Sequence, residues 1–170
     1  MKQNYKSPGN TINTVQILIG LAGLLVGALV YLVDRPPDQT YFVFASPIKL
    51  SLRQILPNLF GLIGNFLPDF IHVFSFILIT AGITSFGKKG YVSICLGWLI
   101  IDCAFELGQK YSTIPLKIIP DWFDSIPFLE NAKNYFLKGT FDIVDVTAIS
   151  LGALAAYYIL LKTMKRREIA

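Results

Sequence analysis

The chain has 170 residues, of which 54% are hydrophobic and only 15% are charged, and its formal net charge is +4. This is more apolar surface than a soluble domain of this length could bury in one core, so the composition indicates a membrane protein, with residues 1–170 forming a single domain. The positive charges collect beside the ends of long apolar stretches, which is typical of membrane topology and argues against a nucleic-acid partner.

Four apolar stretches are long enough to cross the hydrocarbon core, which takes about 20 helical residues. They cover residues 14–33, 69–86, 90–109 and 141–162. Lysine and arginine residues precede the first stretch, occupy the turn between the second and third, and follow the fourth. By the positive-inside rule, both termini and that turn are cytoplasmic, and residues 34–69 and 110–140 lie outside. The expected fold is an all-α bundle of four transmembrane helices with both termini in the cytoplasm.

The first span carries a face of small and polar residues. Gly23 and Gly27 form a GxxxG step, and Asn13, Gln16 and Gly20 fall on the same side of the helix. Such a face could line a ligand groove or a dimer seam. Close helix packing inside the bundle is the simpler interpretation, and we expect it.

The two outer segments are too apolar and too aromatic for ordinary solvated loops. Apolar residues recur at helical spacing over residues 51–66, which predicts an interfacial helix kinked near Pro57, with a re-entrant hairpin as the alternative. The second outer segment alternates charges with aromatic residues, which predicts an interfacial cap whose rings lie at headgroup depth. A lid over a site is the alternative interpretation of this segment.

Polar side chains gather toward the outer ends of the second, third and fourth spans. Carboxylates inside a span are costly and normally face the protein interior, paired with hydrogen-bond donors or water. The donors nearest to these acids in the predicted topology are His72, Gln109, Lys110 and Lys138, and Asp102 lies about one helical turn deeper than the others. The candidate ligand-binding residues are Asp69, His72, Asp102, Glu106, Gln109, Lys138, Asp142 and Asp145.

Three interpretations of this polar cluster compete. It could be a polar latch that fixes helix register, a binding or catalytic pocket open to the outer leaflet, or a site for a hard cation. The candidate catalytic residues are His72, Glu106, Asp142 and Asp145. There is no zinc-binding spacing, nucleophile motif, phosphate loop or dinucleotide fingerprint, so no metal and no cofactor is expected.

The order and spacing of these polar residues form a pattern of three parts. The pattern comprises Asp69 with His72, Glu106 with Gln109, and Asp142 with Asp145 followed by Gly152. Over residues 66–162 it resembles the VanZ-like family of small bacterial membrane proteins. Lys138 and Ser150 stand beside the positions where that family carries an Arg and an Asn.

The resemblance implies a multi-spanning protein of the cell envelope that affects susceptibility to teicoplanin-type glycopeptides or the handling of surface precursors through a polar outer site. Its implied partners are membrane lipids and an envelope precursor or glycopeptide, and a homo-oligomer remains open. The alternative function is a membrane-embedded enzyme acting on a lipid-linked or envelope substrate, with Glu106 or Asp142 as acid or base and His72 as partner. The residues favour binding over catalysis.

Overall fold

The computed structural model describes residues 12–35, 51–53, 55–56, 59–84, 86–126, 129–130 and 132–164. Within these residues, the regular structure is entirely helical. Four helices are long and apolar enough to cross a membrane: α1 (Thr14–Asp34), α3 (Leu67–Thr84), α4 (Lys88–Lys110) and α7 (Ile143–Thr163). The four predicted spans are therefore confirmed, with boundaries displaced by no more than two residues.

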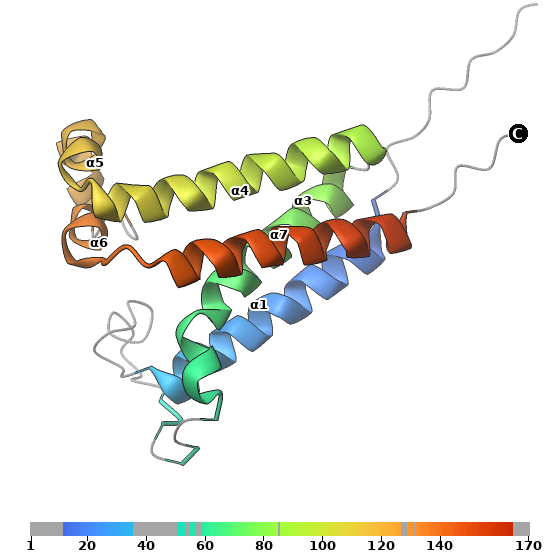
Figure 1. The fold of residues 1–170 in the computed structure, drawn as a ribbon, viewed down its shortest axis with the longest axis horizontal. Coiled ribbons are helices and arrows are strands. Elements are labelled where there is room, and N and C mark those ends of the chain that lie inside the picture. Colours follow the sequence, from blue (N-terminus) through green and yellow to red (C-terminus); the bar gives the residue numbers. More distant parts are fainter. Residues whose placement is uncertain are drawn as a thin grey trace, which may run out of the picture.

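Helix α3 lies at the centre of the bundle and packs against α1, α4 and α7 (Figure 1). The first residues of α1, the turn between α3 and α4, and the last residues of α7 share one end of the molecule, here called the termini end. The last residues of α1 and α4 and the first residues of α3 and α7 share the opposite end, here called the loop end. This arrangement agrees with the predicted topology, in which the termini and the α3–α4 turn lie on one side. The compartment that each end faces stays a prediction.

Glycines bring α1 and α3 into close contact. A Cβ atom added to Gly20 would lie 2.7 Å from Cγ1 of Ile79 and 2.8 Å from the carbonyl oxygen of Ser75. Gly23 and Gly27 face the same helix. The glycine face of α1 therefore packs inside the bundle, as predicted, because a larger side chain would force the two backbones apart.

The small residues of α7 pack against α3 and α4 in the same manner. A Cβ atom at Gly152 would lie 2.5 Å from the carbonyl oxygen of Phe70 and 2.6 Å from Cγ1 of Val73, and Ala153 and Ala156 are buried. The small residues Gly152, Ala153 and Ala156 therefore form a packing face on the last span. The core around it contains Val73, Ile77, Leu78, Ala81, Tyr91, Ile149, Ala153, Ala156 and Leu160.

A buried hydrogen-bond network joins all four spans at the termini end. The Gln16 side chain is fully buried, and its Nε2 donates to the hydroxyls of Tyr91, at 3.1 Å, and Thr163, at 3.0 Å. Nδ2 of Asn13 donates to the carbonyl oxygen of Thr163 at 2.9 Å, and the Asn13 amide donates to that of Gly82 at 2.8 Å. The polar groups at the start of the first span therefore act as a structural latch.

The loop end carries a cap built from three short helices, α5 (Thr113–Ile118), the 3₁₀ helix η3 (Asp121–Ser125) and α6 (Ala132–Lys138) (Figure 1). Helix α6 packs on the end of α4 through aromatic rings: Phe105 lies 5.8 Å from Phe136 and 6.0 Å from Tyr135 between ring centroids. Nζ of Lys133 donates to Asp121 at 2.7 Å and so joins α6 to η3. The depth of this cap relative to a membrane stays a prediction.

The interfacial helix predicted for residues 51–66 is not confirmed. The described part of this segment forms a turn from Leu52 to Leu56 and then the 3₁₀ helix η2 (Gly61–Asn65). Gly61 has a φ of 53°, in the left-handed region that interrupts a right-handed helix. The predicted kink at Pro57 lies outside the described residues.

Candidate functional site

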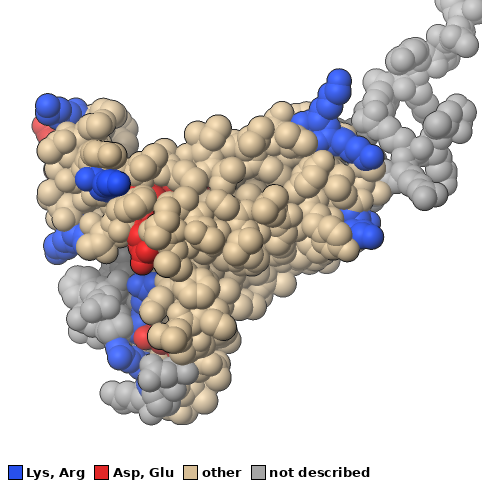
Figure 2. All heavy atoms as spheres, viewed as in Figure 1, with Lys and Arg blue, Asp and Glu red and all other residues tan. Residues whose placement is uncertain are grey.

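Every Asp and Glu in the described part of the chain lies in the half of the molecule toward the loop end (Figure 2). Asp142 is the N-cap of α7, where its Oδ1 accepts a hydrogen bond of 2.9 Å from the Val144 amide. Asp69 and Asp145 lie in the first turns of α3 and α7. These positions suit carboxylates locally, because helix N-termini carry a partial positive charge and unpaired backbone amides.

Glu106 is the buried centre of this cluster, with only 5% of the residue exposed. Its Oε1 accepts a long hydrogen bond of 3.4 Å from Nε2 of Gln109, and its Oε2 is buried without a hydrogen-bond partner among the described residues, although the backbone amide of Asp142 lies close enough to interact with the carboxylate. Asp69, Asp142 and Asp145 all lie within electrostatic range of it. The three predicted spans thus bring Glu106, Asp69, Asp142 and Asp145 to one place, as their spacing predicted. In the described part of the chain, none of these four acids forms an ion pair.

Arg35, at the C-terminal end of α1, supplies a positive charge near the cluster, and the sequence analysis missed it. Its guanidinium lies 5.5 Å from the ring centroid of Tyr31, and its Nη2 donates to the carbonyl oxygen of Asn65 at 3.0 Å. It is also within electrostatic range of Asp69 and Asp145. Its position in the sequence could have identified Arg35, because an arginine directly after the first span lies at the same level as the acids at the start of the second.

His72 makes its direct contact with a deeper acid, Asp102, and is also within electrostatic range of Asp69. Its Nδ1 lies 3.3 Å from Oδ1 of Asp102, and the side chains of these residues are 51% and 8% exposed, respectively. The imidazole also contacts Phe76 and Trp98 edge to face, with ring centroids 4.6 and 6.2 Å apart. The carboxylate that His72 contacts is therefore that of Asp102, one helical turn before Glu106.

Tyr135 connects the cap to the cluster and was also missed. Nε2 of Gln109 donates to its hydroxyl at 2.8 Å as well as to Glu106. Burial, which disfavours the charged phenolate, raises the pKa of Tyr135 to about 12, so its hydroxyl keeps its proton and can donate it. Lys138 is exposed at the end of α6, and in the described part of the chain no ion pair joins it to the acids.

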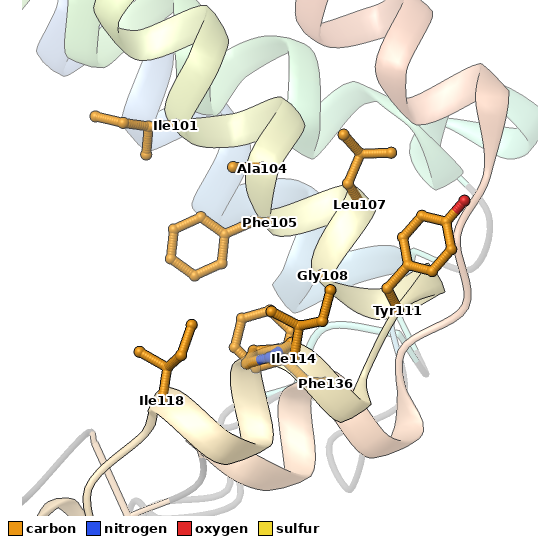
Figure 3. Close-up of a pocket in the computed structure, with 10 residues that line it drawn as sticks. Ile101, Ala104, Phe105, Leu107, Gly108, Tyr111, Ile114, Ile118 and Phe136 are labelled. Atoms are coloured by element: carbon orange, nitrogen blue, oxygen red, sulfur yellow. The ribbon is translucent and has the colours of Figure 1, made fainter.

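An apolar groove of about 510 Å³ lies on the opposite face of α4, under the cap (Figure 3). Its walls come from α4, α5 and the Phe136 ring of α6, and they include Ile101, Ala104, Phe105, Tyr111, Ile114 and Ile118. Among the described residues, no group of three or more His, Cys, Asp or Glu side chains could hold a metal ion.

No family model, curated protein or solved structure matches this chain. The resemblance to the VanZ-like family therefore stays a prediction carried by the motif residues.

Proposed function

We propose that this protein is an integral membrane protein of the bacterial cell envelope that binds a ligand rich in N–H and O–H donors at the Glu106 cluster. Through this binding it would alter susceptibility to teicoplanin-type glycopeptides or the handling of surface precursors. The observation that carries the proposal is the Glu106 carboxylate, which is buried, has a free acceptor oxygen among the described residues and is surrounded by three further acids.

The Glu106 carboxylate differs from the latch at the termini end in its charge and its neighbours. A buried acceptor without a donor costs free energy, and further carboxylates nearby increase the cost. Oε1 of Gln16 is also buried without a hydrogen-bond partner among the described residues, but it belongs to a neutral amide whose Nε2 donates two hydrogen bonds, whereas Glu106 is a carboxylate with three other acids nearby. A ligand amine or hydroxyl would supply the hydrogen-bond donor that Glu106 lacks. The single positive charge of Arg35 would neutralise only part of the negative charge of the site.

A specific observation supports the alternative of a membrane-embedded enzyme. Asp102 is nearly buried and lies against Nδ1 of the half-exposed His72, an arrangement that can orient an imidazole for general acid–base work. Such an enzyme would act on a lipid-linked or envelope substrate, and Glu106 would lie one turn away along α4. His72→Ala would then abolish turnover, whereas a pure binding function centred on Glu106 would survive it.

The test is glycopeptide susceptibility in a susceptible bacterium that expresses the wild-type protein or Glu106→Gln at equal membrane abundance. The wild-type protein is expected to raise the minimum inhibitory concentration of a teicoplanin-type glycopeptide, and Glu106→Gln to abolish that rise. The matched control is Asp121→Asn, which removes an exposed acid at the same end but outside the cluster. Equal protection by the wild-type protein and Glu106→Gln would overturn the proposed role of the cluster.

A further inference from the structure

The groove under the cap is independent of the Glu106 cluster and has its own chemistry. We infer that it binds one acyl chain of an anionic phospholipid, whose phosphate is held by Lys110 and Lys117. This inference goes beyond the proposed function, because the groove and the cluster lie on opposite faces of α4.

The dimensions of the groove fit one lipid chain in one leaflet. Along α4 it extends from Tyr111 to Ile101, which is about 15 Å at the rise of an α-helix and about half of a hydrocarbon core. All of its lining residues are apolar or aromatic, apart from the Tyr111 hydroxyl. Its outer wall is exposed, with Ile118 at 72%, so a chain could enter sideways from the bilayer.

The groove has a basic mouth. Nζ of Lys110 lies 5.8 Å from the ring centroid of Tyr111, which lines the groove, and 4.9 Å from that of Phe141, which directly precedes Asp142. Lys117 is exposed and directly precedes Ile118, another lining residue. Among the described residues, neither lysine forms an ion pair, whereas Asp121 and Asp124 near the end of α5 are both engaged by Lys133.

The cap also carries a side chain typical of the membrane interface. Trp122 in η3 is 60% exposed, and exposed tryptophan is enriched at headgroup level. The cap would then place both lysines at the depth of lipid phosphates while the groove extends into the hydrocarbon. An anionic lipid satisfies both regions together, and a zwitterionic lipid with the same chains satisfies only the apolar one.

The experiment is native mass spectrometry of the full chain released from nanodiscs that contain equal amounts of phosphatidylglycerol and phosphatidylcholine with identical acyl chains. The wild-type protein is expected to retain one phosphatidylglycerol in preference to phosphatidylcholine. If each lysine contributes about 1 kcal/mol, the preference is about 30-fold. The double variant Lys110→Gln/Lys117→Gln is expected to lose this preference, and the matched double variant Lys88→Gln/Lys89→Gln at the termini end to keep it.

Ala104→Trp tests the groove itself, because this exposed small residue lines it and a tryptophan would fill it. The retained lipid is expected to be lost. Gly97→Trp is the matched control, one heptad earlier on the same face of α4, where an added Cβ atom meets nothing within 4 Å. Ile118→Gln, on the exposed wall, checks the result without adding bulk and should weaken retention. Equal retention of the two lipids by the wild-type protein, or unchanged retention in Ala104→Trp, would overturn the inference and leave the Glu106 proposal intact.

Discussion

Replacing Glu106 by glutamine is expected to stabilise the protein. The substitution keeps the shape of a side chain that is only 5% exposed, removes a carboxylate placed among three other acids, and adds an N–H donor that those acids can use. Relief of one buried unpaired acceptor is worth about 1–3 kcal/mol, which raises the unfolding midpoint of a chain of this size by about 2–12 °C. A binding site commonly has this cost, since groups arranged for a ligand are not arranged for maximal stability.

The measurement is thermal unfolding of the purified protein in a mild detergent, followed by tryptophan fluorescence. Asp121→Asn is the control, because it removes an exposed acid at the same end of the molecule but outside the cluster, and the loss of its surface ion pair with Lys133 should hardly move the midpoint. If the cluster is instead a polar latch, Glu106→Gln should lower the unfolding midpoint. A lower midpoint in Glu106→Gln than in the wild-type protein would therefore refute the reasoning and return the cluster to a structural role.

Three further predictions concern packing, the latch and the cap. Gly152→Ala should lower the free energy of unfolding by about 1–3 kcal/mol, because its Cβ atom would lie 2.5 Å from the Phe70 carbonyl oxygen. The control is Gly97→Ala, whose Cβ atom meets nothing within 4 Å, so this variant should be neutral or stabilising by up to about 1 kcal/mol. Equal effects of the two variants would contradict the close packing at Gly152. Gln16→Leu should lower the free energy of unfolding by about 1–3 kcal/mol, because two buried hydrogen bonds are lost. An unchanged unfolding midpoint would rule out the latch. The difference alkaline titration between the wild-type protein and Tyr135→Phe should show a phenol that ionises near pH 12. This group's contribution to stability is then present below pH 10 and is lost as the pH rises toward 12. Ionisation at pH 10 would show that this half-exposed hydroxyl is solvated like that of a free tyrosine.

The sequence predicted the four spans well, because an apolar stretch of membrane length leaves little choice of structure. It also predicted that Asp69, Glu106 and Asp145 come within electrostatic range of one another, because all three lie near helix ends that the topology places at one level. Local signals account for the small shifts in boundaries. The last span begins after Asp142 instead of at Phe141, for example, because the aspartate caps the helix from outside it.

What the sequence could not predict depends on contacts between distant residues. Gln16 bonds to hydroxyls 75 and 147 positions away, and no periodicity in the first span reveals them. Arg35 reaches acids on two other helices only because α1 ends beside them. The single histidine was expected beside the whole acid cluster, yet the rotation of α3 directs it to Asp102, and such a rotation is set by packing against neighbouring helices.

The network at the termini end has a consequence for the order in which the protein is assembled. Asn13 and Gln16 enter the membrane at the start of the first span, and their partner Thr163 is the last residue of the final helix. During synthesis Nδ2 of Asn13 must therefore bind water or lipid until Thr163 has been made, while Gln16 can already bond to Tyr91. A ribosome that stops before Thr163 would leave a chain whose first span keeps its contacts with α3 and the Gln16–Tyr91 hydrogen bond but lacks both bonds to the last helix.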